Sequence, residues 1–251
     1  MIFKTEESPF AQLEYSSFSL STWLDYWYPL ICDFLEINAD EDSVALEEIL
    51  RYYSSNVSKE ELEKQIQNNH VLAIAPGVHL EDQLHRHLTL KDSDIELTIC
   101  ADGATSYLLS QNIIPDIIVT DLDGDVDDQI YAQNKGAIVL IHIHGDNIKV
   151  VQEKLPSFLG GKYAITTQTS PLQGSYNFYG FTDGDRSICL ATLFEAKSIQ
   201  LIGYDFSHTI GKYSKTSELS KKKLERKIKK FTIAKSIINW CCNKNNQVST
   251  Y

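Results

Sequence analysis

The sequence lacks the features that mark secreted, zinc-binding and membrane-spanning proteins. Its five cysteines are an odd number, no two of them form a C-x-x-C pair, and Cys241 and Cys242 are adjacent. This pattern argues against a disulfide framework and a zinc site, and it favours free thiols in a reducing compartment. No apolar run approaches the roughly 18 residues of a membrane span, and the first residues, MIFKTEESPF, lack the regions of a signal peptide. We therefore expect a soluble, cytoplasmic protein with no membrane partner.

Positive charge and phosphate-loop motifs are also scarce. The formal net charge is −11, which argues against a nucleic-acid partner because such proteins carry a basic footprint. An anionic substrate remains compatible with this charge, since bound metal ions can invert the local field. No G-x-x-x-x-G-K-[ST] run occurs, which excludes a P-loop kinase. Hydrophobic residues make up 43% of the 251, enough to build the core of one large domain.

Residues 1–69 are predicted to form a helical N-terminal segment. Apolar residues recur there at helical spacing, first from Trp23 to Phe34 and again from Val44 to Leu50. Residues 38–43 suit a turn and cap between two helices, and Ser58 begins a capping box. The aromatic side chains of this segment could face the core or a partner subunit, so a homodimer is one of two arrangements.

Residues 70–245 are predicted to form a Rossmann-like α/β catalytic domain. Six short apolar runs alternate with amphipathic stretches, as expected for strands buried on both faces of a sheet. The six runs are Val71–Ala75, Leu97–Cys100, Ile117–Val119, Ala137–Ile141, Tyr163–Thr166 and Ile199–Ile202. The alternation predicts a doubly wound, mostly parallel sheet of about six strands. Ligands of such sheets bind beyond the carboxyl ends of the strands.

The end of the α/β region is strongly basic. Residues 212–235 carry ten Lys or Arg and two Glu, with apolar residues at helical steps. This pattern predicts a long C-terminal helix that packs on the domain and turns its basic face outward.

The densest chemical feature follows the third apolar run. Six of the thirteen residues from 116 to 128 are aspartate. In an extended segment Asp121 and Asp123 point to the same side, so their carboxylates converge and would be relieved by a hard cation. Oxygen-only ligands suit Mg²⁺ or Mn²⁺. Asp125, Asp127 and Asp128 fall instead in the first turn of a helix, where aspartates are common without a ligand.

Other polar residues also follow predicted strands. Gly77 lies between a strand and a helix, where backbone can approach a phosphate, although Pro-Gly is an ordinary turn as well. Asp102 and Gly103 suit a ribose or metal contact, and Asp102 suits a helix cap equally well. We interpret His144 and Asp146 as a substrate-facing or second-metal pair.

The longest irregular stretch of the α/β region runs from residue 167 to residue 186. It combines polar side chains such as Gln168 with aromatic residues and Arg186, which suits a flat polar ring and a phosphate. Asp183 and Asp185 open the next helix and could bind a ligand there, while Asp183 could also serve only as a cap.

Five motifs occur in an order that resembles the archaeal 6-hydroxymethyl-7,8-dihydropterin diphosphokinase family, a distant relative of thiamine pyrophosphokinase. The resemblance covers about residues 70–240. Its motifs are Ala101-Asp102-Gly103-Ala104, Pro115 to Gly124, His144-Gly145-Asp146-Asn147, Gly180 to Arg186 and Leu201 to Phe206. It implies a Mg²⁺-dependent transfer of diphosphate from ATP to the hydroxymethyl group of a reduced pterin, with release of AMP, in folate or tetrahydromethanopterin biosynthesis.

The resemblance also implies roles for single residues. Asp121 and Asp123 would bind Mg²⁺ and the phosphates, with Asp102 nearby, and Asp146 and His144 would complete the acidic pocket and supply the base. The remaining assignments are a catalytic role for Arg186 and substrate contacts by Gly77, Gly103, Thr120, Gln168, Asp183 and Asp185.

Three alternatives stay open at this point. A thiamine pyrophosphokinase would accept a cationic thiazolium instead of a neutral pterin. A glycosyltransferase-associated domain acting on nucleotide sugars usually belongs to a longer chain. A non-catalytic nucleotide-binding module would be expected to lose carboxylates, whereas Asp102, Asp121, Asp123 and Asp146 all stand.

Overall fold

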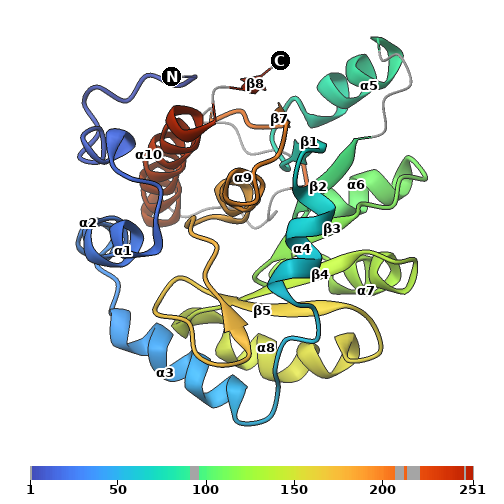
Figure 1. The fold of residues 1–251 in the computed structure, drawn as a ribbon, viewed down its shortest axis with the longest axis horizontal. Helices are drawn as coiled ribbons and strands as arrows, with labels where there is room; N and C mark the ends of the chain where they lie inside the picture. The colour runs from blue at the N-terminus through green and yellow to red at the C-terminus, as the bar shows by residue number, and fades with distance from the viewer. Residues whose placement is uncertain (1, 91–95, 207–211, 214–220, 246, 251) are drawn as a thin grey trace.

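The chain folds around one parallel β-sheet with helices on both faces (Figure 1). The computed structural model describes residues 2–90, 96–206, 212–213, 221–245 and 247–250. Within them the strands run in the order β6-β5-β4-β3-β2-β1-β7-β8, and all neighbours pair in parallel. Their bounds are β1 His70–Ile74, β2 Leu97–Ala101, β3 Ile117–Thr120, β4 Ile138–Ile143, β5 Tyr163–Thr167, β6 Ser175–Tyr176, β7 Ser198–Ile202 and β8 Val248–Thr250.

This sheet confirms the predicted α/β class, and all six apolar runs form strands. The described residues hold eight strands instead of about six, because the two edge strands were not predicted. β6 has two residues and β8 has three, so neither offers an apolar run long enough to be read as a strand.

Helices form in the amphipathic stretches between the strands, as predicted. The described helices are α1 Leu20–Thr22, α2 Tyr28–Leu35, α3 Ala39–Leu50, α4 Lys59–Ile66, α5 Leu80–Leu90, α6 Ala104–Ser110, α7 Val126–Asn134, α8 Ile148–Lys154, α9 Asp183–Leu193 and α10 Lys221–Lys244. Shorter turns of helix are η1 Leu13–Tyr15, η2 Trp23–Trp27, η3 Gly145–Asn147 and η4 Leu155–Phe158. Asn38 caps α3 and Ser58 caps α4, as their sequence positions predicted. None of the described helices is both long and apolar enough to cross a membrane.

The order of the strands explains which face each helix covers. From β1 to β5 each strand lies one place further along the sheet, and right-handed crossovers put α5, α6, α7 and α8 on one face. The chain then returns across the sheet from β6 to β7, so α9 lies on the opposite face. Figure 1 shows α9 there, with α10, α1 and α2 outside it, whereas α3 lies beside α8. The start of α9 consequently lies close to the carboxyl ends of the central strands.

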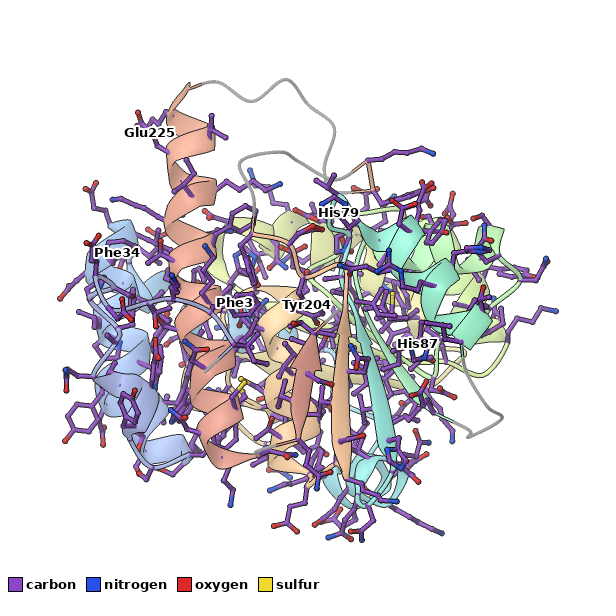
Figure 2. The ribbon with its side chains drawn as sticks, turned by 90° about the horizontal axis from the view of Figure 1, so that it is seen from above. Phe3, Phe34, His79, His87, Tyr204 and Glu225 are labelled. Carbon is purple, nitrogen blue, oxygen red and sulfur yellow. The ribbon has the colours of Figure 1, made fainter. Side chains whose placement is uncertain are left out.

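The N-terminal segment is part of the main core. Trp27 is fully buried, stacks on Phe10 and also contacts the ring of Trp240 from α10. Figure 2 shows α10 between the N-terminal helices, marked by Phe34, and the sheet. The aromatic side chains Trp23 and Trp27 therefore face the core of their own chain, although exposed Tyr26 and Tyr52 do not.

Candidate functional site

Three carboxylates from separate parts of the chain meet at the carboxyl edge of the sheet. Asp102 follows β2, Asp121 follows β3, and Asp183 is the first residue of α9. One oxygen from each lies within 4.8 Å of the others. We call these three residues the carboxylate triad. Each is partly buried, so like charges are held together with limited solvent.

Asp102 is held in place by groups that donate to its carboxylate. Its Oδ1 accepts hydrogen bonds from Thr120 Oγ1 and from Gln129 Nε2, each at 2.7 Å. A side chain at Gly124 would place its Cβ 2.5 Å from Asp102 Oδ2, so glycine is needed for this approach. Burial, followed by the charges of Asp123 and Asp121, raises the pKa of Asp102 to about 7. The site thus contains a carboxylate whose charge is not balanced locally.

Asp121 has the opposite electrostatic behaviour. Burial acts to raise its pKa, but the hydrogen bond and charge of His144 and the charges of Arg186 and Lys230 outweigh burial and bring the pKa to about 2. His144 Nε2 lies 3.6 Å from Asp121 Oδ2. Asp121 therefore stays ionised and is the fixed negative charge at the centre of the triad.

Asp123 lies beside the triad without belonging to it. Its backbone N–H donates to Asp121 Oδ1 at 3.1 Å, and its charge contributes to the raised pKa of Asp102. The following aspartates belong to α7 as predicted: Asp125 is its N-cap, and its Oδ1 accepts from the N–H of Asp128 at 3.2 Å.

Arg186 connects the triad to the strand-end residue Gln168. Its Nη1 donates to Asp183 Oδ1 at 3.0 Å, and its Nη2 donates to Gln168 Oε1 at 3.2 Å. Burial and the charge of Asp121 hold the pKa of Asp183 well above its usual range, although Arg186 opposes the shift. Arg186 is 7% exposed, so this ion pair is largely shielded from water.

Two predicted substrate contacts are engaged inside the protein. Asp185 is 1% exposed, and its oxygens accept from the N–H of Phe181, the N–H of Thr182 and the hydroxyl of Thr182. These bonds cap the start of α9. Thr120 is fully buried, and its hydroxyl donates to Asp102. Asp185 therefore fixes the start of α9, and Thr120 fixes the carboxylate of Asp102.

His142 lies deeper than His144 and has an unsatisfied ring nitrogen. It is 1% exposed, with Nδ1 3.1 Å from Thr166 Oγ1 and with Nε2 unpartnered among the described residues. Arg186 Nε is also buried and unpartnered there. Both residues line a cavity of about 10 Å³.

Asp146 is exposed and lies beside α10. Its side chain is 77% exposed and its Oδ2 lies 3.8 Å from Arg226 Nη2 of α10. His144 is consequently the member of the predicted pair that contacts the triad.

The two predicted glycine contacts are sites of close loop packing. A Cβ on Gly77 would lie 2.1 Å from the carbonyl oxygen of Gly203, and a Cβ on Gly103 would lie 2.1 Å from that of Tyr213. Neither position has room for a side chain, so packing alone explains both glycines. A ligand role is compatible with this geometry because both loops end at the carboxyl edge.

Sequence reasoning missed the contribution of α10. The prediction that its basic face points outward is wrong for Lys230, which is partly buried, lies with Nζ 5.7 Å from the Phe181 ring and interacts electrostatically with Asp121 and Asp183. Lys227 interacts in the same way with Asp123. The signal was present in the sequence as a lysine-rich helix, but only packing determines which lysines face the aspartates.

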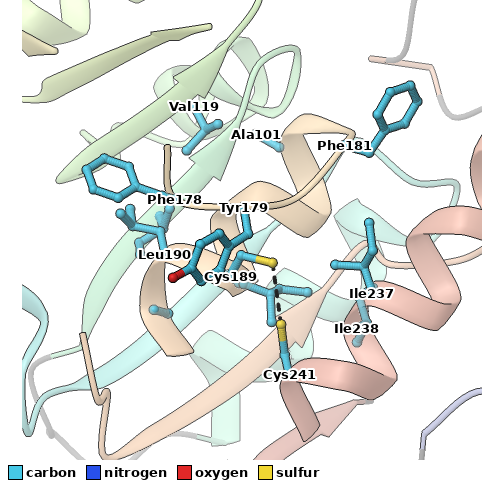
Figure 3. Packing of buried hydrophobic residues seen from close by; sticks show 14 of the residues in the cluster. Ala101, Val119, Phe178, Tyr179, Phe181, Cys189, Leu190, Ile237, Ile238 and Cys241 are labelled. Carbon is cyan, nitrogen blue, oxygen red and sulfur yellow. Dashed lines mark hydrogen bonds between the residues drawn. The ribbon is translucent and has the colours of Figure 1, made fainter. Parts of the chain in front are cut away.

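The aromatic residues of the loop before α9 are buried. Phe178, Tyr179 and Phe181 are each less than 9% exposed and belong to the main hydrophobic cluster (Figure 3). They are packed with α9 and α10 residues such as Leu190 and Ile237, and stacking of their rings on a ligand stays a prediction.

Comparison with known proteins gives a consistent family match. Residues 46–211 match the family model described as 6-hydroxymethylpterin diphosphokinase MptE-like. The 6-hydroxymethyl-7,8-dihydropterin pyrophosphokinase of Pyrococcus furiosus is 39% identical over 88% of this chain and 92% of its own length. Proteins of the same name from Methanothermobacter thermautotrophicus and Methanocaldococcus jannaschii are 34% and 35% identical, over 88% and 81% of this chain and 94% and 87% of their own lengths.

Among solved structures, a Maf glycosyltransferase from Magnetospirillum magneticum is similar at a TM-score of 0.42 and 15% identity. The similarity covers 75% of this chain and 30% of that one.

Proposed function

This chain belongs to the MptE-like 6-hydroxymethylpterin diphosphokinase family, and we propose that it transfers diphosphate from ATP to 6-hydroxymethyl-7,8-dihydropterin with the help of Mg²⁺. The hydroxymethyl oxygen attacks the β-phosphorus of ATP, the bond from that phosphorus to the α-phosphate oxygen breaks, and AMP leaves. The observation that carries the proposal is the meeting of Asp102, Asp121 and Asp183 within 4.8 Å, opposite the basic side chains of α10.

The donor set of the triad suits Mg²⁺. Its three side chains offer only oxygen atoms, which a small hard cation prefers. Burial and neighbouring carboxylates raise the pKa of Asp102 and of Asp183, although Arg186 offsets part of the charge on Asp183, so a divalent cation would favour the ionised forms of both. We propose Asp121 and Asp123 as metal and phosphate ligands, as predicted from their spacing, and we add Asp102 and Asp183 to them.

Bound Mg²⁺ would supply charge stabilisation for the attacking and leaving oxygens of the phosphoryl group. The residues of the chain supply position. Asp121 stays ionised beside His144, while Thr120 and Gln129 fix the direction of Asp102. Diphosphoryl transfer requires little covalent assistance, so holding the reacting groups in line supplies much of the catalysis.

We place the phosphate chain of ATP between the carboxylates and α10. Lys230 and Lys227 approach the aspartates from the helix, and Arg186 approaches from α9. A polyphosphate with its metal ion is negative on the side away from the carboxylates, which is the side that these cations face. The arrangement therefore accommodates a metal–triphosphate layer between an acidic and a basic wall.

His144 is our candidate for the base that accepts the proton of the hydroxymethyl group. Its Nε2 lies 3.6 Å from Asp121 Oδ2 and can accept the proton when the ring is neutral with its hydrogen on Nδ1, after which Asp121 stabilises the imidazolium that forms. Asp146, exposed and beside Arg226, is the second candidate, because it can move toward a bound ligand without disturbing the core.

The proposal is tested by incubating the protein with ATP, Mg²⁺ and 6-hydroxymethyl-7,8-dihydropterin and measuring AMP and the pterin diphosphate. The result we expect is stoichiometric formation of both, lost on addition of EDTA and in an Asp121→Asn variant. Thiamine, tested as the alternative acceptor, should give no AMP. Formation of AMP with thiamine alone would replace the substrate assignment, and ATP binding without AMP from either acceptor would mean a non-catalytic nucleotide-binding protein.

A further inference from the structure

We propose that Asp42, from the N-terminal helix α3, is a positioning residue of the catalytic edge that fixes Gln168, and through it Arg186, as well as the turn that carries His144. This inference rests on the proposed function, because it assigns a task to Asp42 in that reaction. The matched family span begins at residue 46, beyond this aspartate.

The burial of Asp42 is unusual for its place in α3. Asp40, Glu41 and Asp42 all lie in the first turn of the helix, where acidic residues are generally favourable. Asp40 and Glu41 are exposed, whereas Asp42 is 3% exposed. The helix already has its cap, because Asn38 Oδ1 accepts from the N–H of Asp40 at 3.2 Å. A stable helix start therefore does not require a carboxylate buried at position 42.

The carboxylate of Asp42 accepts three hydrogen bonds from three different segments. Oδ2 accepts from Tyr28 Oη at 2.5 Å and from Gln168 Nε2 at 2.6 Å, and Oδ1 accepts from the N–H of Gly145 at 2.7 Å. Burial, followed by the bond to Asp42, raises the pKa of Tyr28, so the phenol remains a donor. Tyr28 belongs to the N-terminal segment, while Gln168 and Gly145 follow strands β5 and β4.

The bond to Gln168 determines which end of its amide faces Arg186. An ionised carboxylate only accepts hydrogen bonds, so Asp42 must face the NH₂ group of Gln168. The carbonyl oxygen Oε1 is then directed to the guanidinium of Arg186, 3.2 Å from Nη2, while Nη1 contacts Asp183. With the amide reversed, two donors would face each other. Asp42 thus sets the direction of the hydrogen bonds that run from Gln168 through Arg186 to Asp183 of the triad.

The hydrogen bond from Gly145 to Asp42 fixes the turn that follows His144. A Cβ at Gly145 would lie 2.8 Å from Glu41 Cβ, so the turn is pressed directly against α3. His144 is the residue before this turn and its backbone N–H donates to Asn147 Oδ1 at 3.0 Å. Asn147 Nδ2 in turn donates to the backbone oxygen of Asp121 at 2.9 Å. Asp42 therefore supports both His144 and the segment that carries Asp121.

The test is a double-mutant cycle between Asp42→Asn and Gln168→Leu, read as kcat and KM for AMP formation. The matched control is Asp40→Asn, which removes the same charge from the same helical turn at an exposed position. We expect Asp42→Asn to lower kcat/KM by about tenfold to a hundredfold, the loss typical of an outer partner of a functional group. Thermal unfolding of each variant reports on folding separately.

A positioning role predicts that the two substitutions are not additive. In the Gln168→Leu background, Asp42→Asn should change kcat/KM only through its remaining contacts with Gly145 and Tyr28, by less than half of its effect on a logarithmic scale. Asp40→Asn should stay within about twofold of the wild-type value, as expected for an exposed surface substitution. Additive losses, or an Asp42→Asn enzyme within twofold of wild type, would overturn the inference.

The same cycle is measured on the Kd for MgATP, so that the inference does not depend on the acceptor. If the wild-type protein made no AMP with the pterin, the proposed function would fall. A non-additive loss of MgATP affinity would then still support a positioning role for Asp42, and unchanged or additive affinities would overturn it.

Discussion

The carboxylate triad and the seam between α9 and α10 are both buried, but they are built on opposite principles. The seam consists of apolar and thiol side chains with 0–1% exposure, among them Cys189, Leu190, Ile237 and Cys241 (Figure 3). Its two thiols are 3.5 Å apart, and burial raises the pKa of Cys189 well above its usual range. Every contact in the seam therefore favours the folded state without requiring a charge.

At the triad, by contrast, like charges are held together and buried. The raised pKa values of Asp102 and Asp183 mean that folding disfavours their ionised forms. A site of this kind is destabilising in the absence of its ligand and is maintained by packing elsewhere in the fold. The comparison teaches that stability and activity should respond to substitutions in different regions of this molecule.

The largest effect on activity is expected from replacing Asp121 of the triad. Asp121→Asn should lower kcat/KM by about a hundredfold to a thousandfold or more, the loss typical when one group that stabilises transition-state charge is removed. Its melting temperature should fall only slightly, because the lost attraction to His144, Arg186 and Lys230 is offset by the relief of repulsion on Asp102 and Asp183. Steady-state kinetics and calorimetry on one preparation check this, and full activity in the variant would remove Asp121 from the site.

The seam should show the reverse behaviour. Ile237 is fully buried, and Ile237→Ala should lower the free energy of unfolding by about 2–5 kcal/mol through lost burial and a residual cavity. The kcat of the folded variant at low temperature should remain close to that of wild type. Urea denaturation followed by tryptophan fluorescence gives the stability. A large loss of kcat with little change in stability would show that the two regions are not separable.

The sequence was sufficient to predict the sheet and the meeting of its strand ends. Apolar runs identify buried parallel strands, and parallel strands bring the residues that follow them to one edge, so the proximity of Asp102 and Asp121 follows from the pattern. The pattern could not distinguish a ligand from a cap or an internal brace. Asp185 and Thr120 have ligand-like identities, yet their hydrogen bonds are made inside the protein.

The sequence pattern could not predict contacts between distant helices. Lys229 and Lys230 are neighbours in one basic helix, but Lys229 Nζ donates to the backbone oxygen of Phe34 while Lys230 faces Asp121 and Asp183. The two lysines differ only in the direction that each one takes from α10, and the packing of α10 against its neighbours sets that direction. The same limit applies to Asp42, because two of its three partners, Gly145 and Gln168, follow strands more than 100 residues further along the chain.

A smaller effect on activity is expected from removing the charge of Lys230 in α10. Lys230→Met keeps the aliphatic stem and removes the charge, and we expect it to raise the KM for ATP by about tenfold, as for the loss of one charge-assisted contact. The KM for the pterin should change little. Lys229→Met is the matched control, because its ammonium group faces Phe34. Equal effects of both variants would show that α10 acts only through its overall charge.

The smallest effect is a pH-dependent gain in stability at Asp102. The carboxyl pKa is raised to about 7 in the fold, above the unfolded value near 4, so ionisation destabilises the metal-free protein increasingly as pH rises through that interval. Asp102→Asn removes this penalty and suits the backbone, because φ is +28° and asparagine tolerates such conformations better than most residues. Its amide oxygen can still accept from Thr120 and Gln129.

In EDTA we therefore expect the free energy of unfolding of Asp102→Asn to match wild type at pH 4 and to exceed it by on the order of 1 kcal/mol or more at pH 8, since one pKa unit corresponds to about 1.4 kcal/mol. Saturating Mg²⁺ should reverse the order, since only the wild-type carboxylate gains from the cation. Melting curves at the two pH values, with and without Mg²⁺, measure both differences. If the variant were less stable than wild type at pH 8 in EDTA, Asp102 would be a structural carboxylate balanced by its donors, and the contrast between triad and seam would fail at that residue.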